Sequence, residues 1–236
     1  MVNKSSERIV EKACNALVAG EIVLLYDFDN REKETDMAIR SDRLRYQDIA
    51  RMRNDAGGLI CTAIPYDAAK KLDIPYARDL LRSVALVEKL GDIPYDPTNQ
   101  SSFSLWVNHK NTFTGITDRD RALTASEIAR AVSKVLSGES FSFSTEFRTP
   151  GHTPILIAAQ KLLSKRRGQT ELSVALAEMA KINPTITICE MLDDESGYAL
   201  SKEDATEYAQ KHNLVFIEGT DVLEFYELKL NEIDDE

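Results

Sequence analysis

Short apolar runs of strand length are the feature that most limits how this chain can fold. One of the longest, IVLLY at residues 22–26, has five residues, whereas a membrane-spanning helix needs about 20. Segments with helical spacing of apolar residues lie between these runs, without the strict alternation of a Rossmann or barrel fold. No Pro-rich or low-complexity linker interrupts the 236 residues, of which 43% are hydrophobic. The sequence therefore predicts one α+β or α/β domain over residues 1–236, with a mixed sheet and surrounding helices.

Local patterns predict where the helices and strands lie. Thr124 and Glu127 form a capping box, which predicts a helix over 124–138. Alternation in the segment 102–109 predicts a half-buried strand with Phe103, Leu105 and Val107 on one face. Further helices are expected at 5–19, 46–55, 154–165 and 170–182, from about Ser201 and from Thr220. Further strands are expected at 21–27, 57–64, 185–191 and 214–218, and a loop at 91–100.

Charge and composition exclude several classes of partner. The net charge of −10 argues against nucleic acid, because phosphate backbones select clustered Lys and Arg. A small anionic substrate needs only a few local cations and stays possible. The first 21 residues lack a continuous apolar segment and a cleavage-type end, so no signal peptide is expected. With no run of membrane length, we expect a cytoplasmic protein with no membrane partner.

The cysteines and two of the histidines give no sign of chemistry by themselves. Cys14, Cys61 and Cys189 are widely spaced and form no C-x-x-C pair, which argues against a disulfide framework and a zinc knuckle. His109 ends a predicted strand and His212 lies late in a polar helix, so both are expected to be incidental.

An acidic segment, DFDNREKETD at residues 27–36, follows directly on the apolar run at 22–26. It gathers five carboxylates and two cations in ten positions. Solvation of an exposed loop explains this composition, and so does binding of a metal ion or of sugar hydroxyls. The segment alone does not choose between them.

A basic segment, KRRGQTELSVAL at residues 165–176, precedes a predicted helix. Three cations come before Gly168, and Thr170 and Glu171 open the helix. The N–H groups and partial positive charge of a helix N-terminus, next to Arg side chains and a hydroxyl, are typical of a phosphate site. A solvated basic turn between two helices explains the pattern equally well.

Two further residues are suited to proton transfer. His152, in FRTPGHTPIL, follows a Pro-Gly turn and precedes the helix expected at 154–165, and imidazole titrates near neutral pH. Glu190 follows the apolar strand TITIC, where a buried carboxylate has to be paired, protonated or metal-bound. A solvent-facing position at the strand end also explains Glu190.

Together these segments describe a cation held by carboxylates, an anion site at a helix N-terminus, and a His with a Glu to move protons. A cation beside a carboxylate base suits proton abstraction next to the ketone of a sugar phosphate. The residues alone do not name the reaction.

Six segments of the chain occur in the order found in the 3,4-dihydroxy-2-butanone 4-phosphate synthase family. They are YDFDNREKETDMAI, DAGGLICTA, FTGITDRDRALT, FRTPGHTPIL, RRGQTELSVALAEMA and ICEM. From about residue 6 to about residue 225 the chain resembles the archaeal, single-domain form of this riboflavin-pathway lyase. The resemblance implies conversion of D-ribulose 5-phosphate to L-3,4-dihydroxy-2-butanone 4-phosphate and formate, with Mg²⁺ or Mn²⁺. It also implies an α+β homodimer with active sites at the subunit interface.

The same resemblance implies a role for each matching residue. Glu32 and Gln169 would hold the metal, Arg31 would meet the substrate, and Asp36 would bind a sugar hydroxyl. The residues implied in phosphate and substrate binding at the basic segment are Arg166, Arg167, Gly168, Gln169 and Thr170. His152 and Glu190 would form the catalytic pair, with Glu190 also contacting the substrate; Cys61 and Thr117 match family positions near the site.

Gln169 is the one departure from the family pattern R-x-G-H-T-E, in which the His is the second metal ligand. An amide oxygen suits Mg²⁺, which prefers oxygen donors, but not an ion that favours imidazole. The enzyme can be active with Gln169 as a ligand or through a bridging water, or turn over slowly, or be a sugar-phosphate-binding homologue without catalysis. The match of the other motif residues favours retained activity, and formate release by Gln169→His distinguishes the alternatives.

Overall fold

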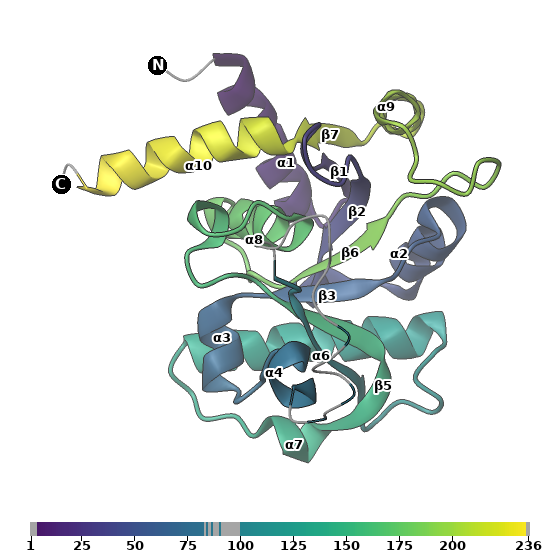
Figure 1. Cartoon of the computed structure of the whole chain (residues 1–236), viewed down its shortest axis with the longest axis vertical. Helices are drawn as coiled ribbons and strands as arrows, with labels where there is room; N and C mark the ends of the chain where they lie inside the picture. The colour runs from purple at the N-terminus through teal and green to yellow at the C-terminus, as the bar shows by residue number, and fades with distance from the viewer. Residues whose placement is uncertain (1–3, 83, 85, 87–89, 91–99, 235–236) are drawn as a thin grey trace.

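A mixed sheet runs through the part of the chain that the computed structural model describes, residues 4–82, 84, 86, 90 and 100–234. Its seven strands lie in the order β4-β5-β3-β6-β2-β1-β7 (Figure 1). The strands are β1 (Val23–Tyr26), β2 (Thr35–Arg40), β3 (Cys61–Ile64), β4 (Phe103–His109), β5 (Phe147–Ile157), β6 (Ile186–Glu190) and β7 (Val215–Glu218). Pairs β3–β5 and β1–β7 are parallel and the others are antiparallel. The predicted α+β class with a mixed sheet is confirmed.

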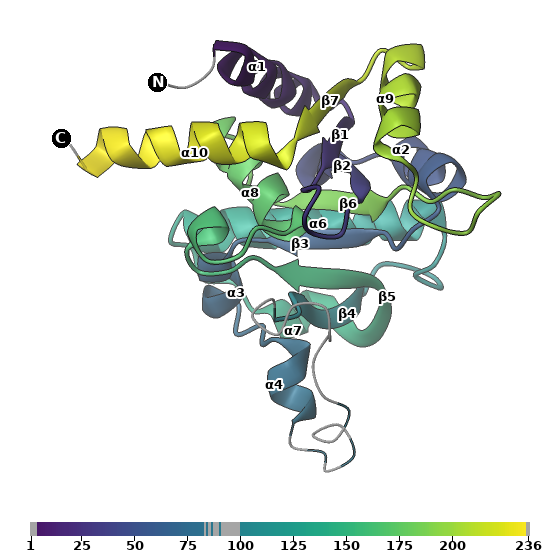
Figure 2. The ribbon, with the colours of Figure 1, turned by 45° about the horizontal axis from the view of Figure 1, so that its top comes forward.

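One face of the sheet is covered by α1 (Lys4–Ala19), α8 (Gln169–Met179) and α10 (Gly219–Asp234), which lie together in Figures 1 and 2. Their apolar side chains, among them Leu17, Leu172 and Val222, pack with strand residues in one buried cluster. Helix α1 is followed by Gly20, whose φ of +79° suits a residue without a side chain. Because α8 is buried almost all round, its N-terminus is held rigidly against the sheet.

The other face carries α2 (Tyr46–Arg51), the π-helical turn η2 (Met52–Ala56), α6 (Asp118–Leu136) and α9 (Lys202–Lys211). Helix α3 (Tyr66–Lys71) packs with α6 against the β4–β5 end of the sheet. The remaining short elements are η1 (Ser41–Arg43), α4 (Ala77–Leu81), α7 (Phe143–Glu146) and η3 (Leu162–Ser164). No helix in the described ranges is both long and apolar enough to cross a membrane.

The helix predicted at 154–165 is wrong. Strand β5 continues to Ile157 and is followed by a loop and the short η3. Ile155 and Ile157 pair with β3 and are almost fully buried, and β-branched side chains favour such a strand. The Pro-Gly dipeptide before His152 accordingly lies inside β5 and not in a turn before a helix.

Helix α6 begins six residues earlier than its predicted capping box. Thr117 is the N-cap, and its Oγ1 accepts from the N–H of Asp120. Thr124 is fully buried inside the helix, where its hydroxyl donates to the carbonyl of Asp120 and accepts from the N–H of His109. The supposed cap therefore joins α6 to the end of β4.

Strand β4 exists as predicted, but its faces do not alternate as expected. Phe103 is 41% exposed and Ser104 is fully buried, because the pairing with β5 shifts register between Phe103 and Trp106 and again after Val107. The other predicted helices and strands are present, with ends that differ by a few residues. The loop predicted at 91–100 lies outside the described residues except for Gln100. The extent of a single domain over 1–236 stays a prediction.

Candidate active site

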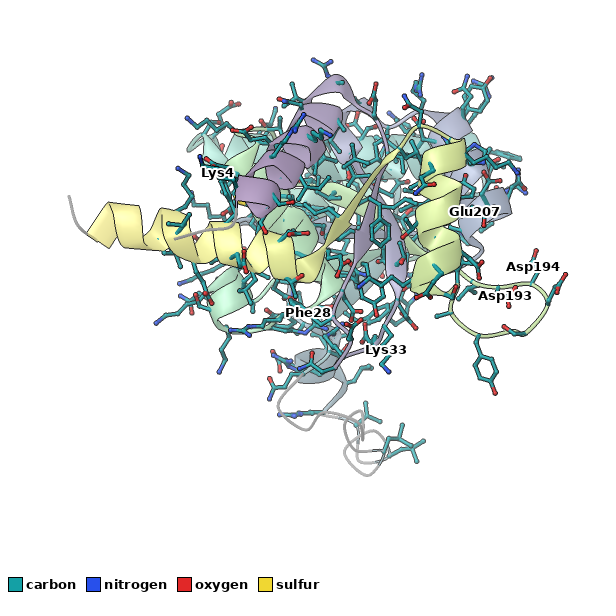
Figure 3. All side chains as sticks on the ribbon, turned by 90° about the horizontal axis from the view of Figure 1, so that it is seen from above. Lys4, Phe28, Lys33, Asp193, Asp194 and Glu207 are labelled. Carbon is teal, nitrogen blue, oxygen red and sulfur yellow. The ribbon has the colours of Figure 1, made fainter. Side chains whose placement is uncertain are left out.

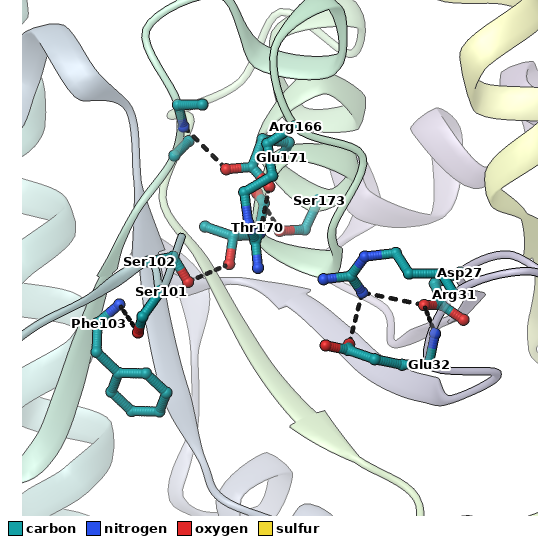
Figure 4. Close-up of polar contacts among 12 residues, drawn as sticks. Asp27, Arg31, Glu32, Ser101, Ser102, Phe103, Arg166, Thr170, Glu171 and Ser173 are labelled. Atoms are coloured by element: carbon teal, nitrogen blue, oxygen red, sulfur yellow. Dashed lines mark hydrogen bonds and ion pairs between the residues drawn. The ribbon is translucent and has the colours of Figure 1, made fainter. Parts of the chain in front are cut away.

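The acidic loop between β1 and β2 is folded around one buried carboxylate. Asp27 is fully buried and accepts from the backbone N–H groups of Glu32 and Glu34, each at 3.0 Å. It also accepts from Nη1 of Arg31 at 3.0 Å, and the same nitrogen donates to Glu32 at 2.5 Å (Figure 4). Asp27 therefore shapes the loop, and Arg31 is held between two carboxylates.

A second acidic turn lies elsewhere. Phe28 and Lys33 mark the acidic loop in Figure 3, whereas Asp193 and Asp194 stand out at the edge of the molecule in the turn that follows β6. The carboxylate of Asp193 accepts from the N–H groups of Glu195 and Ser196 within its own turn. No hydrogen bond between described residues joins this turn to the acidic loop.

Two guanidinium groups converge at the N-terminus of α8. Gly168 is the N-cap, and a Cβ built on it would lie 2.1 Å from Nη1 of Arg166 and 3.0 Å from Nη2 of Arg31. A larger residue at this position would have to displace the Arg166 guanidinium. Arg166 is held by an ion pair of 2.5 Å to the fully buried Glu171, which also accepts from the N–H of Ala159 (Figure 4). The arrangement is suited to binding an anion.

The other predicted phosphate ligands are placed differently. Thr170 is buried in the first turn of α8, and its hydroxyl lies 3.1 Å from that of Ser102. Arg167 is more than half exposed and forms a 3.7 Å ion pair with Glu227 of α10. The structure thus brings Arg166, Gly168 and Thr170 together and directs Arg167 toward α10.

Gln169 has an orientation that its partners determine. Its Nε2 donates to the carbonyls of Leu25 at 2.9 Å and Glu34 at 3.0 Å. A carbonyl can only accept, so the amide nitrogen must face these two atoms. Oε1 is buried and has no hydrogen-bond partner. An orphaned buried oxygen is costly, and it is the kind of donor that Mg²⁺ prefers.

Carboxylates accumulate near Gln169, and one of them, Glu32, is paired with Arg31. Asp36 is 1% exposed, pairs with Glu190 across β2 and β6, and leaves Oδ1 without a hydrogen bond. Burial, followed by the charges of Glu190, Glu34 and Glu32, raises the pKa of Asp36 well above its usual range. Burial, then the charges of Glu32 and Glu190, raises the pKa of Glu34 to about 7. A bound cation would relieve this crowding, so the donor set fits a hard divalent ion.

A backbone cradle that the sequence did not reveal holds Glu190. Its Oε2 accepts from the N–H of Leu59 at 2.8 Å, and its carbonyl accepts from the N–H of Gly58 at 3.0 Å. A Cβ on Gly58 would lie 2.6 Å from that Oε2. Gly57, with φ of +85°, ends the π-helical turn η2 and leads into the cradle. The paired glycines were the signal, but the sequence indicated only a turn.

His152 is exposed on β5 and is held by a residue that the sequence analysis missed. Its N–H donates to Oδ1 of the buried Asn108 at 2.8 Å, and its Nδ1 lies 3.1 Å from Nδ2 of the same amide. Among the described residues, no hydrogen bond or ion pair joins His152 to Glu190. The two residues of the predicted catalytic pair therefore make no direct contact of these kinds, and their joint role stays a prediction.

The two residues matched more loosely have structural surroundings. Cys61 is 2% exposed, and burial, then the charges of Glu190 and Asp36, raises the pKa of its thiol well above its usual range. It therefore stays protonated and is a poor nucleophile. Thr117 uses its hydroxyl to cap α6.

A different group of potential metal ligands lies at the end of β4. Atoms of His109, Glu127 and Glu146 lie within 4.8 Å of one another. The guanidinium of Arg130 forms ion pairs with both of these glutamates, at 2.5 Å to Glu127 and closely to Glu146. A cation is thus already present there in the form of Arg130, and none of these residues belongs to the predicted site.

The sequence of the chain matches one family of known proteins. A profile of the 3,4-dihydroxy-2-butanone 4-phosphate synthase family matches residues 11–225. A protein of that name from Methanosarcina acetivorans is 50% identical over 93% of this chain and 91% of its own length. One from Archaeoglobus fulgidus is 51% identical over 92% of this chain and 93% of its own length.

The fold is shared with solved structures. A crystal structure described as 3,4-dihydroxy-2-butanone 4-phosphate synthase in complex with two magnesium ions has a TM-score of 0.74 and 24% identity, and covers 90% of this chain and 93% of that chain. Neither archaeal relative carries a name that indicates a binding protein without catalysis, so the alternative of lost catalysis has no support. The chain belongs to the 3,4-dihydroxy-2-butanone 4-phosphate synthase family of riboflavin-pathway lyases.

Proposed function

We propose that the chain converts D-ribulose 5-phosphate to L-3,4-dihydroxy-2-butanone 4-phosphate and formate. The observation that carries this proposal is the position of Arg31. Its Nη1 forms an ion pair with Glu32 of the acidic loop. Its other terminal nitrogen, Nη2, lies beside Gly168 and Arg166 at the start of α8. An anion site and a carboxylate-rich site therefore adjoin, as a sugar bearing a phosphate at one end requires.

Glu32 and Gln169 would hold Mg²⁺ or Mn²⁺. The orphaned Oε1 of Gln169 supports this assignment, because it is oriented by two backbone carbonyls and offers an oxygen ligand in place of imidazole. When bound, the ion would polarise a carbonyl or enediolate oxygen of the sugar. Asp36 would orient a sugar hydroxyl beside it.

Arg166, Gly168 and Thr170 would bind the phosphate, with Arg31 closing the site from the acidic loop. Glu171 keeps the Arg166 guanidinium in place, so little side-chain order has to be gained on binding. Arg167, paired with Glu227, would act at the outer rim of the substrate site.

Glu190 would be the base that takes a proton from carbon next to the carbonyl. The N–H of Leu59 fixes one of its oxygens, and the absence of a side chain on Gly58 leaves room for the carboxylate close to the backbone. His152 would complete the pair by interacting with a substrate oxygen.

A homodimer would bring that pair together at the subunit interface. His152 of β5 is exposed, and apolar side chains are exposed on the adjacent strand β4 and in the turn that follows β4. They are Phe103 at 41%, Trp106 at 43%, Phe113 at 91% and Ile116 at 51%. Exposed aromatic clusters of this kind are typical of protein interfaces. The net charge of −10 supports a metabolic role without nucleic acid, and we place the enzyme in the cytoplasm as a biosynthetic lyase.

Formate release from D-ribulose 5-phosphate tests the proposal, with Mg²⁺ and with EDTA. We expect magnesium-dependent formate from the purified chain and none from Glu32→Ala or Glu190→Ala, each with an unfolding transition close to that of the wild type. No formate from the folded wild-type chain, although it binds the substrate, would contradict the proposed activity. Near-normal activity of either variant would contradict the corresponding residue's role.

A further inference from the structure

The side chain of Asn108, at the end of β4, is buried against His152. Asn108 is 3% exposed, and its Oδ1 accepts from the backbone N–H of His152 at 2.8 Å. A backbone N–H can only donate, so this contact identifies the amide oxygen and fixes which way the amide faces. The assignment does not depend on the protonation of the imidazole.

Two glycines let the chain pack closely around Asn108. Gly115 has φ of +91°, and a Cβ on it would lie 2.1 Å from Nδ2 of Asn108. A Cβ on Gly151 would lie 2.0 Å from the carbonyl carbon of Val107 and 2.3 Å from the backbone nitrogen of Asn108. The turn that contains Gly115 is itself held by Asp120, whose carboxylate accepts from three consecutive N–H groups at residues 113–115.

The fixed amide favours one position for the proton of the imidazole. Nδ2 of Asn108 lies 3.1 Å from Nδ1 of His152, whereas Oδ1 is farther, at 3.3 Å, and already accepts the backbone N–H. An amide N–H donates only to a ring nitrogen that has no proton. The neutral imidazole that this contact favours therefore has its proton on Nε2, the nitrogen that points away from Asn108.

We propose that Asn108 is a positioning residue that holds His152 as its Nε2–H tautomer. This inference rests on the proposed role of His152 and assigns the two members of the catalytic pair. His152 would offer a hydrogen-bond donor to a substrate oxygen on which negative charge develops, without giving up its proton. Glu190 would then be the group that accepts the proton from carbon.

Replacement of Asn108 by Asp tests the assignment with little change of shape. The carboxylate still accepts the N–H of His152, but it replaces the amide donor by an acceptor, so Nδ1 must carry the proton. Two-bond ¹⁵N–¹H NMR of histidine-labelled protein at about pH 8, where most imidazole is neutral, reads the tautomer directly, and His152→Ala identifies the signals. We expect the Nε2–H form in the wild type and the Nδ1–H form in Asn108→Asp.

Asn111→Asp is the matched control, since it adds the same charge in the neighbouring turn without touching His152. It should keep the Nε2–H tautomer and the wild-type rate. The Nδ1–H form in the wild type, or the same tautomer in wild type and Asn108→Asp, would overturn the inference.

Kinetics separates this inference from the proposed function. With His152 in the wrong tautomer, we expect kcat for formate release to fall about 10²-fold or more while KM changes little. A tautomer that switches with no change of kcat would support the positioning by Asn108 and contradict the catalytic role of His152.

Discussion

Two amide side chains, Gln169 and Asn108, have fixed orientations because each hydrogen-bonds to backbone groups that can act only as an acceptor or only as a donor. Gln169 donates to two carbonyls, and Asn108 accepts from an N–H. The consequence differs between the two residues. Gln169 is left with Oε1, which can bind a cation, and Asn108 is left with an Nδ2–H, which can donate to the imidazole of His152. Neither orientation can be derived from the sequence, because the partners come from segments far along the chain.

Gln169→Ala and Gln169→Glu separate the two roles of this side chain. The Ala variant removes two hydrogen bonds, to the carbonyls of Leu25 and Glu34, so we expect the free energy of unfolding in EDTA to fall by about 1–3 kcal/mol. The Glu variant places carboxylate acceptors against those carbonyls, so its free energy of unfolding should fall at least as far. Urea titrations measure this effect, and Mn²⁺ titration should show weaker binding to the Ala variant. Unchanged stability and unchanged Mn²⁺ affinity would contradict the description of Gln169.

Cys14 gives a pH-dependent effect outside the site. Burial, then the carboxylate of Glu11, raises the pKa of its thiol from 9.0 to about 11. Between these values the unfolded chain has lost a proton that the folded chain keeps, so the free energy of unfolding falls as the pH rises.

We expect Cys14→Ala to make that fall shallower, in urea titrations at about pH 8 and pH 10. The buried Cys189, whose pKa is raised to about 12, stays in both proteins, so the difference between them isolates Cys14. Parallel pH profiles would show that the folded thiol ionises as easily as the unfolded one.

At the scale of elements, the turn between η2 and β3 supplies the backbone N–H groups that hold Glu190 in position. Gly58→Ala would put a methyl group 2.6 Å from the Glu190 carboxylate, and we expect kcat to fall about 10²-fold, as for a small misplacement of a reacting group. Leu59→Ala is the matched control, because it removes a half-exposed side chain and keeps the N–H that Glu190 accepts. Equal rates for the two variants would mean that the cradle does not position the base.

Elements with a strong local pattern were predictable, and those decided by pairing were not. Helix α8 and the strand leading to Glu190 follow from their apolar spacing and their flanking residues. Strand β5 was mistaken for a helix because PILIAAQKLLSK also has helical spacing, and only its pairing with β3 and β4 decides the matter. The start of α6 was misplaced because Thr124, with a suitable Glu127, imitates a cap while joining the helix to β4.

The candidate site shows the same division. Residue types near one another in sequence, such as Arg31 with Glu32 and Arg166 with Thr170, suggested a metal end and a phosphate end. They left a solvated loop and a solvated turn open, and the resemblance to the family favoured the binding roles. Asn108 and Gly58 were not found, because each acts on a residue far along the chain and only the folded sheet brings them into contact.

At the scale of the whole molecule, mixing two inactive variants tests whether the site is shared between subunits. Glu190→Ala and His152→Ala should each be inactive alone. If each site takes its Glu from one chain and its His from the other, a refolded equal mixture should regain about one quarter of the wild-type activity, since about half of the dimers are mixed and each has one intact site. No regained activity, with mixed dimers shown by differently tagged chains, would place both residues in one chain.

The pairing of β1 with β7 ties the beginning of the chain to its end. Strand β1 lies between β2 and β7, and β7 comes from residues 215–218. Until the ribosome has added β7, the β7 side of β1 has no partner strand, and its unpaired N–H and C=O groups can pair with another nascent chain. Translation therefore has to pass residue 218 before the sheet can close, and a polysome carrying many copies is where this enzyme is most exposed to misassembly.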